Sequence, residues 1–420
     1  MKSGFLALLL FVSLPAMAQQ VQLTATIHGR PQQTEILPSS DHLTVVFIHE
    51  NAAEFIVLNS DFQPVFEQHI SDLGLTSGAT YLGVSEEQSG WHLYYVHQEN
   101  LLSVRVTKRG QREIMRLEGY SNANFSGSFS FNGTMHLLRL SAWENKLRLV
   151  KFRDGKQVFS ETFRISMPDF VSRAQGQFVK MSESAHHMTD SFHPAKWYRF
   201  DDRLIFTLET GNATEIVEVD LLSSVVHERK VRWLPADPQT NSNTLGVGNY
   251  LIHSSSLPDF FSMEIMDLSS DVIAYSCEVS PEGINEGGTL IGWYGHRHQL
   301  FSEKADGLSS KQEISGWLTA VHSHQHLGLS VIPSERGYFL EAGGISFEEV
   351  RGSTGMILDR IFQRDFLGLE LIIPGDQKHM SAPLVFSSLR HPGFVISSRW
   401  NAKQVSVART RSGTIEIWQE

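Results

Sequence analysis

Two hairpin-turn dipeptides constrain this chain more than any other feature of its sequence. Asn132-Gly133 and Asp154-Gly155 each separate two short runs rich in apolar residues. Asn, Asp and Gly tolerate positive φ, which both central positions of a type I′ hairpin turn require. With a third turn at residues 142–145, residues 125–165 are predicted to form a four-stranded antiparallel meander of about 40 residues, the size of one propeller blade.

The same pattern recurs along the chain. The second strands of the first three predicted units begin near His42, Trp91 and Thr134, at spacings of 49 and 43 residues. We therefore predict an all-β fold, a β-propeller of about seven four-stranded antiparallel blades, with six or eight as the alternatives. The N-terminal strand, residues 21–27, is expected to complete the last blade, because ring closure removes exposed strand edges.

Other segments depart from the repeat. Residues 166–196 form a connection of about 30 residues, a length at which loops tend to be functional or disordered. Residues 318–323 are predicted to be a strand, and residues 359–369 are compatible with a helix or a strand. A single propeller domain over residues 19–420 is the favoured division, and a boundary near residues 235–238 is the alternative.

The N-terminus has the pattern of a secretory signal peptide. Lys2 supplies the positive charge, residues 5–14 the apolar core, and Ala16-Met17-Ala18 the small-x-small cleavage site. The apolar run is too short to span a bilayer as a helix, and no second long run follows. We expect cleavage after Ala18 and a soluble, monomeric, exported protein that is periplasmic or extracellular.

Charge and cysteine content limit the classes of partner and of stabilisation. The formal net charge is −11, so the chain has no overall basic footprint for nucleic acid, and no nucleic-acid partner is expected. Cys277 is the only cysteine, so an intrachain disulfide is excluded. Because free cysteines are mostly buried, Cys277 is predicted to be a buried strand residue.

Histidines supply the candidate metal ligands. On a strand, His296 and His298 would share a face about 7 Å apart, and so would His322 and His324. Each pair could offer two imidazoles to a zinc-type ion, with a third ligand from another strand or loop. The favoured alternative is that all four are half-exposed strand residues. No cofactor is therefore expected, and zinc or a similar divalent metal is the minority hypothesis.

Turn and loop residues supply the candidate binding positions. His186, His187 and His193 lie in the long connection at residues 166–196. Trp143 lies in the predicted turn at residues 142–145, where an exposed indole would stack on a sugar or grip a protein. Packing of Trp143 in the core or at the rim is the favoured alternative. These residues suit a protein or a carbohydrate ligand.

The sequence lacks familiar catalytic motifs. It has no Gly-x-Ser-x-Gly elbow, no phosphate-binding loop and no His-Glu-x-x-His. Glu86 and Glu87 are adjacent, and neighbours on a strand point to opposite faces, so they are not an acid–base couple by themselves. The leading hypothesis is an exported non-enzymatic binding or interaction module. A hydrolase or lyase acting on an extracellular polymer such as a polysaccharide is the alternative, and a structural partner of an envelope complex is the third.

Overall fold

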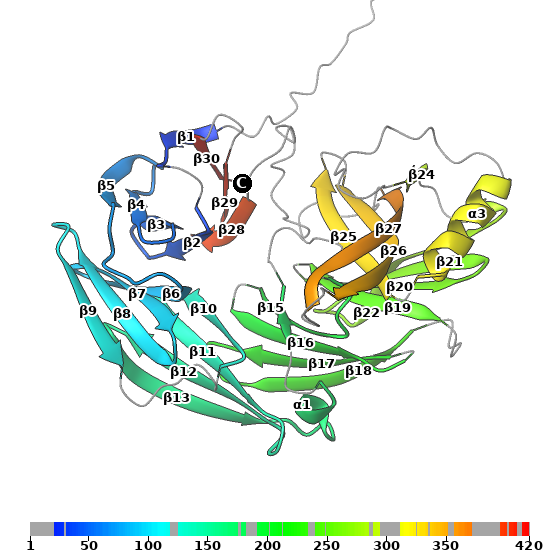
Figure 1. The fold of residues 1–420 in the computed structure, drawn as a ribbon, viewed down its shortest axis with the longest axis horizontal. Coiled ribbons are helices and arrows are strands. Elements are labelled where there is room, and N and C mark those ends of the chain that lie inside the picture. Colours follow the sequence, from blue (N-terminus) through cyan, green and yellow to red (C-terminus); the bar gives the residue numbers. More distant parts are fainter. Residues whose placement is uncertain are drawn as a thin grey trace, which may run out of the picture.

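The computed structural model of this chain is nearly all-β (Figure 1). The described residues form seven sheets, five with four strands and two with five. Figure 1 shows these sheets following one another in chain order around the molecule, which is the architecture of a β-propeller. The predicted fold class is confirmed. The structure describes residues 21–28, 31–117, 125–174, 178–181, 191–200, 202–211, 213–233, 240–247, 249–284, 289–294, 311–324, 326–334, 337–351, 357–371, 395–400, 403–409 and 414–419.

The first three sheets are simple four-stranded antiparallel meanders, each paired in chain order. Their strands are β2 (Gln33–Pro38), β3 (Leu43–Ile48), β4 (Ala53–Leu58) and β5 (Pro64–Ile70) in the first, β6 (Thr80–Glu87), β7 (Gly90–His97), β8 (Asn100–Thr107) and β9 (Arg112–Leu117) in the second, and β10 (Gly127–Phe131), β11 (Thr134–Ser141), β12 (Lys146–Arg153) and β13 (Lys156–Arg164) in the third.

The fourth and fifth sheets each add a short fifth strand to the meander. The fourth follows the short helix α1 (Phe170–Arg173) and contains β14 (Val179–Lys180), β15 (Ala195–Phe200), β16 (Arg203–Glu209), β17 (Ala213–Asp220) and β18 (Val226–Arg232), and the fifth contains β19 (Asn241–Val247), β20 (Tyr250–Leu257), β21 (Phe260–Asp267), β22 (Val272–Ser280) and β23 (Gly283–Ile284). β14 pairs parallel with β15, whereas the other pairings in these two sheets are antiparallel.

The last sheet of the chain contains the first strand. Its order is β1-β30-β29-β28, so the N-terminal strand pairs antiparallel with the C-terminal one, as predicted. The preceding sheet has the order β24-β27-β26-β25 and is accompanied by the helix α3. The bounds are β1 (Val21–Thr26), β24 (Thr289–Tyr294), α3 (Lys311–His322), β25 (His326–Ser334), β26 (Gly337–Arg351), β27 (Ile357–Leu371), β28 (Val395–Trp400), β29 (Lys403–Arg409) and β30 (Thr414–Gln419).

The two turns that organise the third sheet have the backbone that their residue types predict. φ is 46° at Asn132 and 64° at Gly133, and it is 52° at Asp154 and 68° at Gly155. Positive φ at both central residues is what a type I′ turn needs to match the twist of its strands. The turn prediction is therefore confirmed at both positions.

Large apolar side chains pack between neighbouring sheets. The fully buried Trp91 of β7 stacks on Phe55 of β4, with ring centroids 4.3 Å apart. Trp197 of β15 is likewise buried and lies 6.0 Å from the ring of Phe129 in β10. An aromatic ring of this size buries about 150–250 Å², so such contacts dominate the energy of packing one sheet on the next. Cys277 is 1% exposed, which confirms the prediction that it is a buried strand residue.

The strand prediction for residues 318–323 is wrong, because most of this segment lies in helix α3. Ile314, Leu318 and Val321 recur at helical spacing and form one buried face of that helix. Residues 359–369, which were compatible with a helix or a strand, lie within strand β27. His322, the last residue of α3, therefore follows a helix and does not lie on a strand.

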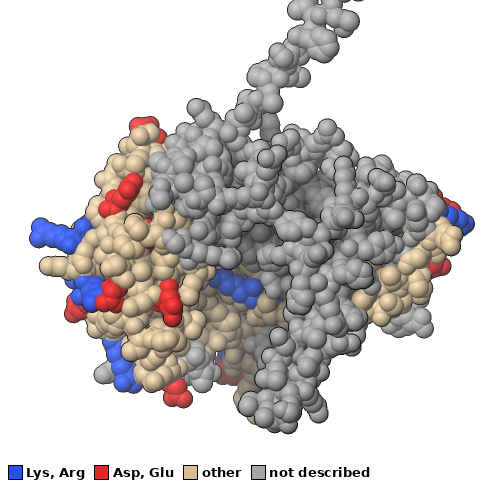
Figure 2. Space-filling model, turned by 45° about the horizontal axis from the view of Figure 1, so that its top comes forward, with Lys and Arg blue, Asp and Glu red and all other residues tan. Residues whose placement is uncertain are grey.

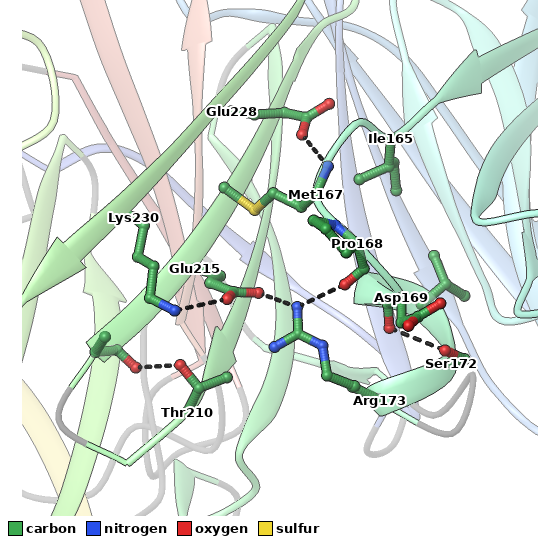
Figure 3. Close-up of polar contacts among 12 residues, drawn as sticks. Ile165, Met167, Pro168, Asp169, Ser172, Arg173, Thr210, Glu215, Glu228 and Lys230 are labelled. Atoms are coloured by element: carbon green, nitrogen blue, oxygen red, sulfur yellow. Dashed lines mark hydrogen bonds and ion pairs between the residues drawn. The ribbon is translucent and has the colours of Figure 1, made fainter.

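The connection after β13 is fastened to the fourth sheet (Figure 3). The Arg173 guanidinium donates to the Pro168 carbonyl at 3.0 Å and to the Glu215 carboxylate of β17. The Met167 backbone N–H donates to Glu228 of β18 at 2.7 Å. These contacts hold the first part of the long connection in a fixed position, so at least residues 166–174 are built into the scaffold.

Candidate functional site

An open polar cleft of about 1040 Å³ lies at one end of the first three sheets. Its lining comes from the β2–β3, β6–β7 and β10–β11 turns and from the β8–β9 and β12–β13 turns. In an antiparallel meander the chain reverses at every turn, so the first and third turns of each sheet emerge at the same end. The cleft is thus a consequence of the repeat, which brings turns from three neighbouring sheets together.

His42 and Glu86 connect the first two sheets at the cleft. His42 Nε2 lies 2.9 Å from Glu86 Oε1, and His42 Nδ1 lies 2.8 Å from Asp41 Oδ1. The Thr44 hydroxyl donates to the same Glu86 oxygen at 3.0 Å. Burial opposes the charged form of the imidazole, but the hydrogen bonds and charges of Glu86 and Asp41 outweigh it and raise the pKa of His42. Both ring nitrogens are therefore engaged by carboxylates.

Glu87 has partners of its own. Arg105 Nε donates to Glu87 Oε1 at 2.8 Å, and Ser89 donates to the same oxygen at 2.5 Å. Burial raises the pKa of Glu87, but Ser89, Arg105 and the nearby His92 lower it more, so the net shift is downward. Glu86 and Glu87 therefore pair with different side chains, Glu86 with His42 and Glu87 with Arg105.

Charged side chains on two turns remain available to a ligand. The Arg153 guanidinium donates to the Thr134 hydroxyl at 3.1 Å. Within the described part of the chain, the Lys108 and Asp154 side chains form no hydrogen bond or ion pair. The cleft therefore presents both signs of charge. Figure 2 shows the same mixture over the described part of one face, with basic and acidic residues interspersed.

A buried tyrosine fixes the position of the β12–β13 turn. The Gly155 backbone N–H donates to the Tyr94 hydroxyl at 3.2 Å, and that hydroxyl lies 3.0 Å from Ser85 Oγ. Burial raises the pKa of Tyr94 to about 12, so the hydroxyl stays protonated. A Cβ at Gly155, where φ is 68°, would lie 2.7 Å from Met115 Cε and 2.9 Å from His92 Nδ1, so a side chain there would have to displace both. The cleft residues on this turn are thus held rigidly.

The residues singled out in the sequence lie elsewhere. Trp143 is 99% exposed on the β11–β12 turn, so the favoured prediction that it packs in the core or at the rim is wrong. This is the second turn of its sheet, at the opposite end from the cleft. His193 is half-buried, with its ring 4.1 Å from that of Phe192. His186, His187, His296 and His298 lie outside the described residues.

His322 and His324 lack the strand geometry that motivated the metal hypothesis. His322 is the last residue of α3, and its Nδ1 lies 3.1 Å from the Ser256 carbonyl oxygen. Asn241 Nδ2 donates to the carbonyls of His322 and His324, at 3.0 Å each. The expected side-by-side placement on a strand is therefore wrong, while their role as ligands stays a prediction.

The cleft groups that sequence reasoning missed are His42, Lys108, Arg153 and Asp154. Each stands in or beside a hairpin turn, where polar residues are expected for solubility alone. The feature of the sequence that could have predicted the cleft is the order of the turns within each meander. Polar residues at the first and third turns of consecutive meanders must gather at one end of the propeller.

Comparisons with known proteins identify no family. No family model matches the chain, and no curated protein does. Similar solved structures include apo AztD from Citrobacter koseri (14% identity, TM-score 0.29, 57% of this chain and 60% of that one). Others are BamB from Moraxella catarrhalis (10% identity, TM-score 0.32, 95% and 100%) and the β-propeller domain of Swd1 from Myceliophteria thermophila (11% identity, TM-score 0.29, 94% and 99%).

The match to AztD spans only about 60% of that protein's chain. At these identities and TM-scores the likenesses carry no argument about function, and the propeller assignment rests on the sheets themselves. Among the residues that the structure describes, no helix combines the length and apolar character needed to cross a membrane.

Proposed function

We propose that this chain is an exported, non-enzymatic binding propeller whose polar cleft receives a charged segment of a partner protein. The observation that supports this proposal is that carboxylates of Asp41 and Glu86 occupy both ring nitrogens of His42. A general base needs an unprotonated nitrogen within hydrogen-bond reach of the substrate. Carboxylates engage both nitrogens of His42 and favour its charged form. Glu86 and Glu87 are occupied in the same way by His42 and Arg105.

The composition of the cleft favours a peptide over a sugar. Among the described residues that line it, none is Phe, Tyr or Trp. Carbohydrate sites usually supply an aromatic face on which the sugar ring stacks, whereas charged side chains of both signs suit a polar peptide. Lys108, Arg153 and Asp154 are the groups we expect to contact it. The polysaccharide hydrolase or lyase hypothesis has no such supporting observation.

The test is binding of the full chain to an array of random charged peptides. Wild-type protein should enrich a set of peptides, and the double variant Lys108→Glu, Arg153→Glu should lose at least tenfold in affinity for them. Arg148→Glu is the matched control, because Arg148 is an exposed arginine on the same strand β12 but does not line the cleft. Equal binding by all three proteins would contradict the proposal.

The non-enzymatic part has a separate test. A panel of polysaccharides is incubated with wild-type protein and with Glu86→Gln, and released ends are measured. Turnover by the wild type that disappears in the variant would establish the enzyme hypothesis instead.

Export is tested by N-terminal sequencing of the protein recovered from a secreting bacterial host. Cleavage after Ala18 and recovery outside the cytoplasm are the expected results. An intact N-terminus in the cytoplasm would contradict this part of the proposal.

A further inference from the structure

Three histidines surround one buried glutamate at the end of the first sheet opposite the cleft. Glu54 is the second residue of strand β4, His49 lies in the turn before that strand, and His69 is near the end of β5. His28 comes from the link that follows β1. The second turn of a meander and its incoming link emerge at the same end of the sheet, which is why these residues meet.

Two of the imidazoles and one carboxylate oxygen converge on a single point. His28 Nδ1 lies 2.9 Å from Glu54 Oε2, and His69 Nδ1 lies 3.8 Å from the same oxygen. The ligand atoms of these three residues all lie within 4.8 Å of one another. A zinc ion with bonds of about 2.0–2.1 Å places tetrahedral ligands about 3.4 Å apart. The three atoms therefore need only sub-ångström to ångström shifts to share an ion.

The other carboxylate oxygen is held by separate donors. Glu54 Oε1 accepts a hydrogen bond from the His28 backbone N–H at 2.8 Å and lies 2.9 Å from His49 Nε2. Because Oε1 is occupied in this way, Oε2 is the oxygen that faces His28 and His69. Hydrogen bonds that orient a ligating carboxylate are a regular part of metal sites. His49 is thus placed as a positioning residue.

The glutamate of the cluster is buried, and two of its histidines are open to solvent. The Glu54 side chain is 8% exposed, whereas those of His28 and His69 are 69% and 32% exposed. The two rings lie 4.2 Å apart, centroid to centroid, and both face the same carboxylate. A carboxylate has two oxygens with about four acceptor sites, and Oε2 of Glu54 is the one that His28 and His69 share on the solvent side.

We infer that His28, Glu54 and His69 form a zinc-type metal site with a coordination position open to solvent. Two imidazoles and one carboxylate are a ligand set that suits Zn²⁺ and related divalent ions. The site would also join two parts of the ring. His28 follows β1, which pairs with β30 in the last sheet, while Glu54 and His69 belong to the first sheet. A bound ion therefore clamps the seam where the propeller closes.

The experiment uses the full chain, purified without a histidine tag and stripped with a chelator. Zn²⁺ is titrated in against a chromophoric chelator, and Co²⁺ is added separately to record its visible absorption. One ion per chain is expected, with a Co²⁺ spectrum of low coordination number. His28→Ala and His69→Ala should each weaken Zn²⁺ binding at least tenfold. His49→Gln should weaken it about 10–100-fold, as loss of an orienting contact does.

Two histidine variants serve as controls. His227→Ala removes an exposed histidine on β18 and should leave affinity unchanged. His322→Ala tests the alternative cluster at the end of α3, and it should also bind as the wild type does. The absence of Zn²⁺ binding by the wild type would overturn the inference. Loss of the ion in His322→Ala but not in His28→Ala would do the same.

A structural readout keeps the test independent of affinity alone. Hydrogen exchange of the β1 amides should slow when Zn²⁺ is added to the wild type, and it should not change in His28→Ala. Because the His28 side chain is largely exposed, this variant is expected to fold, which its circular dichroism spectrum checks. A Zn²⁺ effect on β1 that persists in His28→Ala would contradict the clamp.

Discussion

A buried ion pair joins the fourth and fifth sheets and makes a quantitative prediction about their packing. Lys196 of β15 is fully buried, and its Nζ donates to Glu209 Oε1 at 2.8 Å and to Asn243 Oδ1 at 2.8 Å. Glu209 Oε1 also accepts the Thr244 backbone N–H at 2.9 Å. Lys196 and Glu209 belong to the fourth sheet, and Asn243 and Thr244 to the fifth. Removal of the ammonium therefore affects both sheets at once.

We predict that Lys196→Met lowers the free energy of unfolding by about 3–5 kcal/mol, the cost of leaving one member of a buried pair alone. Burial lowers the pKa of Lys196 and raises that of Glu209, with the partner opposing each shift. The loss of hydration thus outweighs the attraction between the two charges at both groups. Replacing both by apolar residues of similar volume is often neutral or stabilising. The double variant Lys196→Met, Glu209→Leu should therefore be more stable than the single variant.

The assay is urea unfolding followed by tryptophan fluorescence, with the free energy taken from the midpoint and slope. Lys230→Met is the control, because the Lys230 side chain is 47% exposed in its ion pair with Glu215. Because the Lys230 ammonium is half in solvent and the 8% exposed Glu215 keeps its ion pair with Arg173, loss of Lys230 is expected to cost about 0–1 kcal/mol. The reasoning is refuted if Lys196→Met costs no more than this control. A double variant whose loss in free energy of unfolding equals the sum of the losses in Lys196→Met and Glu209→Leu would also contradict it.

Three further predictions concern the turns and the buried histidines. Gly155→Ala should cost roughly 2–4 kcal/mol, because positive φ and a close neighbour both penalise a Cβ; Gly211→Ala, where φ is also positive but no atom lies within 4 Å, should cost less in the same unfolding assay. Burial lowers the pKa values of His136 and His253 to about 3, below the unfolded value of 6.5. Between pH 6.5 and about 3 each unfolded histidine binds a proton that the folded one does not, so the free energy of unfolding falls as pH falls, by about 1.4 kcal/mol per pH unit and histidine. His136→Phe should therefore lose stability less steeply when unfolding is measured from neutral to acid pH. An unchanged slope would contradict this. Trp143→Ala should change the free energy of unfolding by less than about 0.5 kcal/mol, because the side chain is fully exposed. Acrylamide should quench Trp143 fluorescence strongly in the wild type. A large loss of stability in the variant would show that the indole has packing partners.

The fold could be predicted from the sequence because its determinants are local. Asn132-Gly133 and Asp154-Gly155 specify their own backbone, and the strand period on either side of each turn specifies which face is buried. The pairing of β1 with β30 followed from the need to remove sheet edges, which is a property of the whole ring. The misassigned segment at residues 318–323 shows the limit, because a short apolar run does not by itself distinguish a strand from a helical turn.

The candidate sites could not be predicted, because their residues are distant in sequence. His42 and Glu86 are 44 positions apart and meet only because two sheets pack side by side. The metal ligands predicted from the sequence were pairs spaced i and i+2 on one expected strand, such as His322 and His324. The cluster at Glu54 instead combines a link, a turn and two strands, and His28 reaches it only because the ring closes.

The two candidate sites occupy opposite ends of the first sheet, and this separation has a physical origin. The interior of each strand is committed to inter-sheet packing, so a polar residue there is costly unless it is paired, as Lys196 is. Turns and links do not pack between sheets, so polar residues there stay in contact with water. The first and third turns converge at one end and build the cleft, while the second turn and the incoming link converge at the other and build the His28–Glu54–His69 cluster. Substitutions at one end should therefore leave the other end's ligand affinity unchanged, since about 20 Å of packed strand separates the ends of a six-residue strand and its turns.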